Sequence, residues 1–449
     1  MPDIWDETHP AHAAQWSAGN PAKAAAAAEL INARLNGLRF ASADDLTALR
    51  PTILASGLRE ELARAARRLV DVITHYCWGL TGDPRELARL CGLEPHQQPF
   101  LDAASPQLER ALAACNARPD ALLRDGVPVF LEANFGAANS SPITTNALLP
   151  VYEELYGCVP TTGQAELREP FAARAALYSR ICEDYGFDRR VLILGTVREP
   201  DIGSARYLEA EADYLGAHGF ESRYVEPDFF ATPRGHDVAR SGGIVLKHFL
   251  PEEWQSLGFN IPWPDLRSAH RTMAWIVPDS GLSLSSKLVF GWLSQHSDRL
   301  DPDDAAFVRR HIPWTRVLDG KDLDFRGTTY APTKLLTEFQ SDLVLKPATS
   351  CAGQGVLVGR ATRESVWADK VARVASAGTH VVQERVEADE LVMDFYDASA
   401  KSVVRKPVSY VLGPYVVDGR SAGCSIRHTV SSESGIVNHA SGAGINIVL

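Results

Sequence analysis

One stretch of the sequence decides the fold: residues 118–134, which read RPDALLRDGVPVFLEAN. Apolar runs flank Asp125-Gly126, and Asp-Gly between apolar runs is a strong signal for a β-hairpin. Glu132 and Asn134 are two residues apart, so in a strand their side chains leave the same face. The stretch therefore predicts a hairpin with a polar face near its open end.

The expected strand register brings acidic and basic side chains together. With a three-residue loop over 125–127, Asp120 lies opposite Glu132 and Arg118 lies opposite Asn134. One face of the hairpin would then carry a pair of carboxylates, an amide and a guanidinium group.

Two opposed carboxylates repel each other, so a functional pairing of Asp120 with Glu132 requires a compensating cation. Mg²⁺ bridging nucleotide phosphates fits, because it takes oxygen ligands and typically needs only one or two protein carboxylates. Arg118 would add a fixed positive charge for a phosphoryl oxygen. The spacing alone leaves a second interpretation open, an exposed polar face on which Arg118 is the counter-ion.

A lysine follows the apolar run 343–345 in the last third of the chain. Lys346 precedes a loop of small residues over 348–355 that includes Gly353 and Gly355. Such a loop lets backbone N–H groups approach an anion, and the lysine adds a point charge. It is not a Walker A loop, because no Gly-Lys-Ser/Thr ends it. A glycine-bearing hairpin with an exposed lysine is the alternative.

Further polar positions are candidates for ligand contacts. Gln383-Glu384 end an apolar strand, where a carboxylate beside exposed backbone amides could bind an adenine edge or a ribose. Arg427 and Asn438 precede the small residues 441–444, and a buried arginine there would stabilise charge developing on a transferred group. Two alternative interpretations remain open. Gln383-Glu384 could be a solvated strand end, and Arg427 could be a surface arginine beside a glycine turn.

The composition excludes several classes of protein. The 449 residues carry 45 Lys and Arg against 56 Asp and Glu, a net charge of −11 with His neutral. This acidic balance argues against a nucleic-acid partner bound through many duplex phosphates. With 45% hydrophobic and 22% charged residues, the chain has a globular composition, which excludes wholesale disorder.

No targeting or membrane signal stands out. The acidic N-terminal segment lacks a signal-peptide pattern, and no apolar run reaches the roughly 20 residues of a membrane span. The 7 cysteines include no Cys-x-x-Cys pair, which favours reduced thiols over a zinc site or a disulfide framework. We therefore expect a cytoplasmic protein with no membrane partner.

Hydrophobic periodicity divides the chain into four parts. Residues 1–105 are expected to form a helical cap, because apolar residues recur there at three- and four-residue steps. Residues 106–189 contain the hairpin and two helices, and residues 190–275 show the βαβ pattern of a small parallel sheet. Its first turn, 196–200, is not Gly-x-Gly-x-x-Gly, so a dinucleotide site is not expected. Residues 276–449 are strand-rich.

Together, the motifs resemble the circularly permuted ATP-grasp ligases, the group of glutathionylspermidine synthetase and eukaryotic glutathione synthetase. The resemblance is carried by Arg-x-Asp, Asp-Gly and Leu-Glu-x-Asn within 118–134, in the order that the family has them. It implies that Asp120, Glu132 and Asn134 are Mg²⁺ ligands and that Arg118 contacts the γ-phosphate of ATP.

The resemblance also implies nucleotide contacts in the last third of the chain. Lys346 with Gly353 and Gly355 would form an ATP-clamping hairpin. Gln383-Glu384 would be the adenine hinge, and Lys287 would be the first ATP lysine. Arg427 and Asn438 would act on the reacting groups, and residues 276–449 would form the ATP-binding lobes.

The implied fold class is α/β (α+β), with a circularly permuted ATP-grasp core. An N-terminal helical region and a small parallel-sheet domain of the pre-ATP-grasp type would complete it. The sequence departs from the family after Asn134, where Phe135-Gly136 replaces Asp-Thr-Pro. Ser350 or Cys351 stands where eukaryotic glutathione synthetase has a metal-holding glutamate, so we expect a product other than glutathione or its spermidine conjugate.

The expected function is that of an ATP- and Mg²⁺-dependent carboxylate–amine ligase. It would form an amide bond through an acyl phosphate, on amino-acid or small-peptide substrates. Its partners would be a small-molecule carboxylate and an amine, and a homodimer is compatible with the sequence. The alternatives are a nucleotide-binding scaffold that no longer turns over and an ATP-dependent phosphotransferase.

Overall fold

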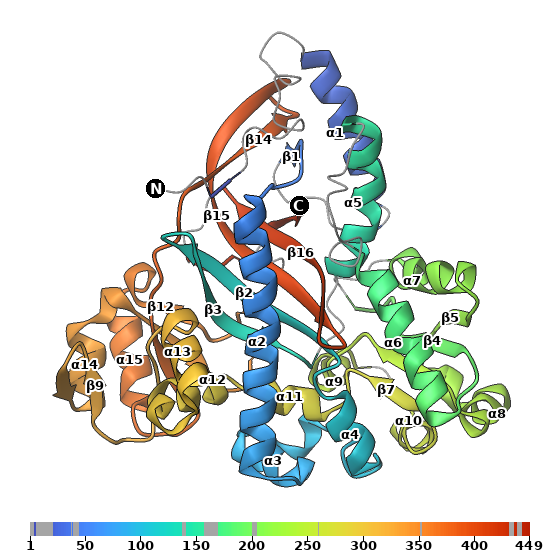
Figure 1. Cartoon of the computed structure of the whole chain (residues 1–449), viewed down its shortest axis with the longest axis horizontal. Helices are drawn as coiled ribbons and strands as arrows, with labels where there is room; N and C mark the ends of the chain where they lie inside the picture. Colours follow the sequence, from blue (N-terminus) through green and yellow to red (C-terminus); the bar gives the residue numbers. More distant parts are fainter. Residues whose placement is uncertain are drawn as a thin grey trace.

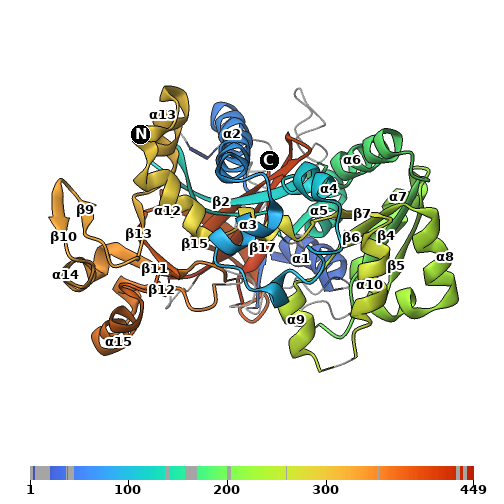
Figure 2. The ribbon, with the colours of Figure 1, turned by 90° about the horizontal axis from the view of Figure 1, so that it is seen from below.

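A central antiparallel sheet lies between two smaller lobes (Figures 1 and 2). The computed structural model describes residues 4–5, 21–36, 38, 45–136, 141–156, 169–199, 204–258, 260–350, 353–430, 435–437 and 442–449. The parallel sheet and its helices form one lobe, and the last α-helices with the β8–β13 strands form the other (Figure 2). Helices and strands mix throughout, as the α/β expectation requires.

The central sheet joins distant parts of the chain. Its main path runs β1-β14-β15-β16-β17, and the hairpin β2–β3 attaches to it through β15. The strands are β1 (Leu46–Ala48), β2 (Asn116–Arg124), β3 (Val127–Asn134), β14 (Leu391–Asp397), β15 (Ser402–Val417), β16 (Arg420–Thr429) and β17 (Gly444–Val448). All its pairings are antiparallel. The hairpin from the first third of the chain is thus part of the same sheet as the C-terminal strands.

The hairpin forms as predicted, but its loop is shorter than expected and one of its strands contains a bulge. Its loop has two residues rather than three: Asp125 (φ 54°) and Gly126 (φ 72°) both lie in the left-handed region, as a type I′ turn requires. A bulge at Leu131 supplies the missing residue, because Asp120 pairs with Glu132 whereas Ala121 pairs with Phe130. The predicted pairings of the polar residues are therefore confirmed, and the predicted loop length is wrong.

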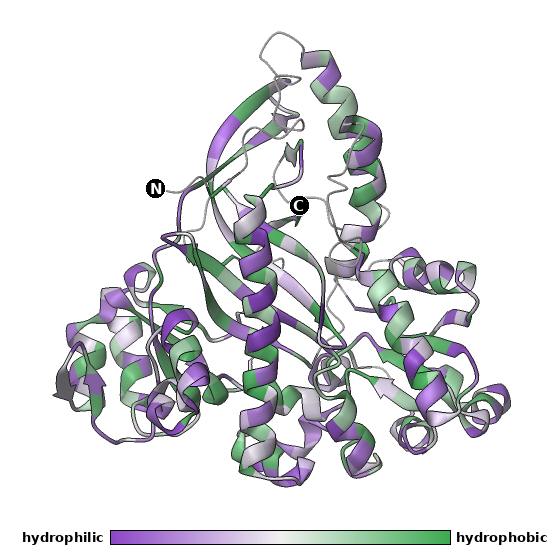
Figure 3. Cartoon of the chain, viewed as in Figure 1, coloured by the Kyte–Doolittle hydropathy of each residue, from purple (hydrophilic) through white to green (hydrophobic). Residues whose placement is uncertain are grey.

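Helices cover both faces of the central sheet. Helix α2 (Ser56–Leu80) packs its apolar stripe, including Leu62, Leu69 and Ile73, against one face, while Leu80 at its end is exposed. Figure 3 shows hydrophilic and hydrophobic residues alternating along α2, as expected for an amphipathic helix. Helices α1 (Pro21–Asn36), α5 (Ser141–Tyr156) and α6 (Pro170–Tyr185) pack in the other core, and α5 confirms the helix predicted there.

The predicted βαβ region forms a parallel sheet of order β5-β4-β6-β7. Its strands are β4 (Arg190–Leu194), β5 (Glu221–Val225), β6 (Ile244–Lys247) and β7 (Ala274–Ile276), with helices α7 (Ala205–Ala217), α8 (Pro233–Ser241), α9 (Pro251–Ser256) and α10 (Trp263–His270). Strands β4 and β6 are almost wholly buried, which explains their continuous apolar sequences. Strand β7 leads into α11 (Ser280–Leu284), which contacts strand β3 of the central sheet.

A second antiparallel sheet, of order β12-β11-β13-β8, builds the other lobe. Its strands are β8 (Thr315–Val317), β11 (Leu343–Pro347), β12 (Leu357–Val358) and β13 (His380–Glu384), and a small hairpin pairs β9 (Leu323–Phe325) with β10 (Thr328–Tyr330). Helices α12 (Lys287–Gln295), α13 (Pro302–His311), α14 (Pro332–Glu338) and α15 (Glu364–Val374) accompany these strands. Two short helices that contact each other, α3 (Pro84–Leu90) and α4 (Pro106–Leu112), complete the α-helices of the described residues.

The described cysteines and the lengths of the helices can be compared with the expectations from the sequence. Cys77, Cys91, Cys115, Cys182 and Cys424 are all free thiols. Across the described ranges, every helix is too short or too polar to cross a lipid bilayer.

Candidate active site

Asp120 lies at the centre of the polar face of the hairpin. Its carboxylate accepts hydrogen bonds from Nε of Arg118 at 3.1 Å and from Nη2 of Arg427 at 2.6 Å. Burial alone would raise the pKa of this carboxyl, but Arg118 and Arg427 outweigh burial and hold it below its usual value. Asp120 is therefore ionised and fixes both arginines side by side.

Arg118 needs space to reach along the sheet, and Gly413 on β15 provides it. A Cβ atom at Gly413 would lie only 3.0 Å from Cδ of Arg118. Arg427 comes from the neighbouring strand β16, 307 residues further along the chain than Asp120. The sheet topology thus assembles this cluster from segments that the sequence separates widely.

Glu132, the other predicted carboxylate ligand, faces the first residue of α12. The Nζ atom of Lys287 lies 3.4 Å from Oε2 of Glu132 and donates a hydrogen bond to the carbonyl of Ser350 at 2.9 Å. The backbone N–H of Lys287 also donates to the carbonyl of Ala348 at 2.9 Å. Lys287 therefore joins the acidic hairpin to the loop that follows Lys346.

The bulge at Leu131 connects the hairpin to the second antiparallel sheet. Its carbonyl accepts a hydrogen bond from Nζ of Lys346 at 3.1 Å and one from Nε2 of Gln383 at 3.3 Å. Gln383 is buried and also donates to Oγ1 of Thr315 at 3.1 Å. Leu131, the extra residue of the bulge, thus accepts hydrogen bonds from Lys346 and Gln383, which are both predicted to contact ATP.

Lys346 is nearly as buried as Asp120, and its environment favours loss of a proton. Burial is the main cause that lowers its pKa, to about 8; Lys287 lowers it further, while Glu132 and Asp120 oppose the change. Below that pH the ammonium group is charged and its nearest protein partner is a neutral carbonyl. An anionic ligand would give it a stronger partner.

The cluster carries an excess of positive charge. Arg118, Arg427, Lys287 and Lys346 face Asp120 and Glu132, so 4 − 2 leaves a charge of +2 with Lys346 protonated. Unbalanced charge in a largely buried site is costly unless a ligand neutralises it. The arrangement suits a polyanion.

The predicted magnesium ligands differ in how accessible they are. The side chain of Glu132 is 27% exposed, whereas that of Asp120 is 6% exposed and already holds two arginines. Asn134 donates its amide to the carbonyl of Arg118 at 3.2 Å, which leaves its own carbonyl oxygen for a cation. Within the described residues, no group of three or more His, Cys, Asp and Glu side chains forms a metal cage. The donor set fits Mg²⁺ that shares its ligands with phosphates, provided that Asp120 exchanges an arginine contact.

Some predicted residues lie at the edge of this cluster. Gly353 (φ 72°) and Gly355 (φ 70°) adopt the left-handed conformation, and a Cβ at Gly355 would lie 2.9 Å from Pro347, so the loop requires glycine there. Glu384 pairs with Nη2 of Arg326 at 3.0 Å, a contact that the sequence analysis missed. Asn438 lies outside the described residues.

Ser285 is a second residue that the sequence analysis did not assign. Its Oγ accepts hydrogen bonds from the backbone N–H groups of Phe135 at 2.8 Å and Gly136 at 3.1 Å, directly after the Glu-x-Asn strand. The feature of the sequence that could have pointed to Ser285 is its position two residues before Lys287. Ser285 ties the end of β3 to the start of α12.

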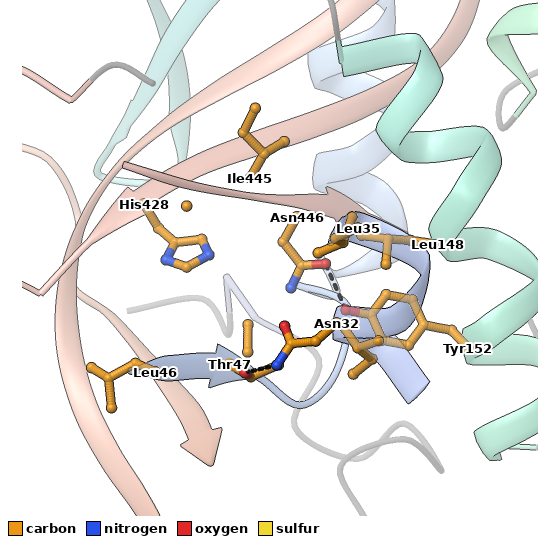
Figure 4. A pocket seen from close by; sticks show the side chains of 12 residues that line it. Asn32, Leu35, Leu46, Thr47, Leu148, Tyr152, His428, Ile445 and Asn446 are labelled. Carbon is orange, nitrogen blue, oxygen red and sulfur yellow. Dashed lines mark hydrogen bonds between the residues drawn. The ribbon is translucent and has the colours of Figure 1, made fainter. Parts of the chain in front are cut away.

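A separate small cavity lies beside β16 (Figure 4). Its lining residue His428 leaves the strand on the face opposite to Arg427, because successive side chains of a strand alternate between its faces. The cavity is lined by His428, the neighbour of Arg427, and by Asn32, Thr47, Tyr152 and Asn446 among others. Its volume of about 20 Å³ suits a single water molecule. Burial lowers the pKa of His428 to about 4, so its imidazole is neutral there. This cavity is too small to hold a nucleotide or an amino acid.

Comparison with known proteins supports the fold. No protein-family model matches the sequence, and no curated protein matches it. The chain is similar in structure to a glutathione synthetase-like effector from Globodera pallida in its apo form: the TM-score is 0.57 and the identity is 11%, over 97% of this chain and 99% of that one. The likeness over nearly the whole length of both chains shows a shared fold.

A second structure matches less well. It is a protein assigned as a gamma-glutamylcysteine synthetase from Methylobacillus flagellatus KT, with 12% identity and 88% of each chain covered. Its TM-score of 0.39 is too low to support any further argument.

Proposed function

We propose that the chain is an ATP- and Mg²⁺-dependent carboxylate–amine ligase built on a circularly permuted ATP-grasp core. The observation that carries this proposal is that Arg118, Arg427 and Lys287 pair with the carboxylates of Asp120 and Glu132, while Lys346 donates to the adjoining carbonyl of Leu131. These residues come from separate segments, which the sequence assigns to ATP, to metal or, for Arg427, to the reacting groups. Their net positive charge suits a nucleoside triphosphate.

The fold supports the same proposal. The chain shares its architecture with a glutathione synthetase-like effector, and a hairpin with the Glu-x-Asn strand precedes the lysine loop, as a permuted core requires. The fold alone does not determine activity, so the proposal depends on the site residues.

The chemistry would proceed in two transfers. A substrate carboxylate oxygen attacks the γ-phosphorus of ATP, the bond to the β,γ-bridging oxygen breaks, and ADP leaves with that electron pair. An amine then attacks the acyl phosphate carbon, inorganic phosphate leaves, and the amine loses a proton as the amide forms. Each transfer requires positioning and charge stabilisation more than a side-chain nucleophile.

Each cation would have a separate task. Lys287 and Lys346 would hold the phosphates, and Arg118 would contact the transferred phosphoryl group. Arg427 would stabilise the oxyanion of the tetrahedral intermediate. Asp120, which holds both arginines, would orient them before ATP arrives.

Bound Mg²⁺ would neutralise charge on the β- and γ-phosphates, with Glu132 and Asn134 as accessible ligands and Asp120 as the third. Gly353 and Gly355 would let the loop backbone approach the nucleotide. Gln383 and Glu384 would face adenine and ribose.

The experiment measures ADP and phosphate release from ATP and Mg²⁺ with a panel of amino acids and small peptides. We expect release that depends on a carboxylate and an amine, at least tenfold lower for Glu132→Gln. Glu387→Gln, which removes an exposed carboxylate paired with Arg385, is the control and should retain the rate. Absence of ADP with every pair, or an unchanged rate for Glu132→Gln, would contradict the proposal.

A second candidate, a nucleotide-binding scaffold without turnover, is favoured by one observation. Asp120 already has arginine partners on both oxygens, so a metal must displace one of them. Calorimetry separates the candidates, because the scaffold binds ATP with Mg²⁺ but releases no ADP with any substrate pair. A phosphotransferase would instead leave a stable phosphorylated product, visible by mass spectrometry.

A further inference from the structure

We infer that Asp279, held by the buried Lys247, is a positioning residue that fixes Lys287 and the end of the Glu-x-Asn strand relative to each other. Lys247 ends strand β6, and its Nζ lies 2.7 Å from Oδ1 of Asp279, just before α11. Their side chains are 1% and 0% exposed, so no ligand reaches them directly. The inference rests on the proposed function, in which Lys287 holds ATP.

Asp279 is fixed from several directions. Its other carboxylate oxygen accepts a hydrogen bond from the backbone N–H of Phe100 at 2.8 Å. Its carbonyl accepts one from Nε2 of Gln98 at 2.7 Å, and the same amide lies 3.2 Å from Oγ of Ser283 in α11. The start of α11 is therefore tied to the segment after α3 as well as to the parallel sheet.

Glu109 in α4 adds another anchor to the start of α11. Its Oε2 accepts a hydrogen bond from the backbone N–H of Ser280 at 2.8 Å, and its carbonyl accepts one from Oγ of the same serine at 2.9 Å. A helix whose first residue is held on several sides cannot shift without breaking buried polar contacts, which is costly.

The other end of α11 meets the candidate active site. Ser285, directly after α11, holds the N–H groups of Phe135 and Gly136, and Lys287 follows two residues later. A Cβ at Gly281 would lie 2.9 Å from the carbonyl of Phe135, so α11 and the end of β3 are in close backbone contact. A displacement of α11 would therefore move Lys287 and the end of β3.

The backbone before Asp279 is also strained. Val277 has φ of 66°, a conformation that β-branched residues rarely adopt. Such strain persists only where the surrounding structure fixes the backbone, and it is commonest near functional sites. Strand β7 on one side and the Lys247–Asp279 pair on the other fix Val277 in this way.

The test compares this ion pair with another buried pair, which hydrogen-bonds to Asn116 and Tyr178. Arg174 and Glu211 lie 2.6 Å apart with side chains 0% and 1% exposed, so Glu211→Gln is a matched control for Asp279→Asn. In the full-length protein without nucleotide, the rate of reductive methylation at Lys287 is measured by mass spectrometry. We expect a several-fold higher rate for Asp279→Asn and an unchanged rate for Glu211→Gln.

Kinetics supply the second measurement. We expect kcat for ADP release to fall at least tenfold in Asp279→Asn while KM for ATP changes less, because Lys287 is misplaced rather than lost. The double variant Lys247→Met/Asp279→Leu should recover the melting temperature, since apolar residues often replace a buried pair without loss of stability. It should recover neither kcat nor the protection of Lys287.

Two outcomes would overturn the inference. One is equal methylation of Lys287 in Asp279→Asn and in Glu211→Gln, and the other is full recovery of protection in the double variant. The methylation measurement requires no turnover, so it decides the inference even if the chain proves not to be a ligase. Absence of ADP release in the wild type would contradict only the proposed function.

Discussion

The cluster around Asp120 and the pair Arg174–Glu211 are both buried and ionic, yet they differ in two respects. The side chains of Arg118 and Arg427 remain 12% and 13% exposed, and cations outnumber carboxylates around Asp120. Arg174 and Glu211 are sealed, at 0% and 1%, and balance each other. Residual exposure with unbalanced charge is what the proposed ligand site requires, whereas a sealed and balanced pair offers nothing for a ligand to neutralise.

The largest effect is expected when a sealed pair is broken. Glu211→Ala removes the carboxylate that neutralises Arg174 and should lower the free energy of unfolding by about 3–5 kcal/mol. Chemical denaturation measures this loss. Inorganic pyrophosphate should not reverse it, because no anion reaches a sealed site; reversal would erase the contrast between the two regions.

The buried Glu109 should make the free energy of unfolding depend on pH. Burial, followed by the charge of Asp279, raises the pKa of Glu109 to about 7, so its protonated form is favoured in the folded protein. Its contribution to stability is complete below pH 4.5 and is lost as the pH rises through 7, by about 3 kcal/mol at most.

Glu109→Gln should abolish this loss, because glutamine keeps the acceptor for Ser280 without a charge. Unfolding free energies of both proteins between pH 4.5 and 7 test the difference. Parallel pH profiles would show that Glu109 titrates normally.

The cluster around Asp120 should tolerate the loss of a contact better than the Arg174–Glu211 pair does. Asp120→Ala removes hydrogen bonds to Arg118 and Arg427, but both arginines retain contact with solvent, so we expect a loss of about 2 kcal/mol. Pyrophosphate should raise the melting temperature more in this variant than in the wild type, because it can occupy the place of the carboxylate. A loss as large as that of Glu211→Ala with no response to pyrophosphate would contradict the assignment of a ligand site.

The smallest effect concerns Lys346. Because its pKa lies near 8, its charge is lost above that pH, and affinity for ADP with Mg²⁺ should fall by up to tenfold per pH unit, about 1.4 kcal/mol. Lys346→Arg keeps its charge and should bind ADP with little pH dependence over this range. Calorimetric titration at several pH values measures both proteins, and identical profiles would exclude Lys346 as the titrating group.

Local patterns predicted much of the hairpin and the parallel sheet. Asp-Gly and the alternation around it indicate the hairpin, but the bulge at Leu131 has no sequence signal, so the loop length was wrong although the polar pairs were right. Apolar runs predicted β4 and β6 because buried parallel strands lack polar positions.

Contacts between distant segments could not be predicted in this way. Neither the partnership of Asp120 with Arg427 nor that of Glu384 with Arg326 follows from spacing, because each depends on how separate strands pack. The lysines at 287 and 346 were placed near the hairpin only by family resemblance. Lys247 and Asp279 each have an ordinary local sequence, and their pairing appears only in the folded chain.

The attachment of β2 to β15 also affects how the protein folds. A ribosome completes the hairpin long before it reaches strand β15, which pairs with β2 at Leu412 and Ala121. Until then the outer edge of β2 exposes backbone groups that could pair with another chain. Such non-local pairing makes folding slow and leaves partly folded chains open to aggregation, so recovery of active protein should improve when synthesis is slowed or chaperones are abundant.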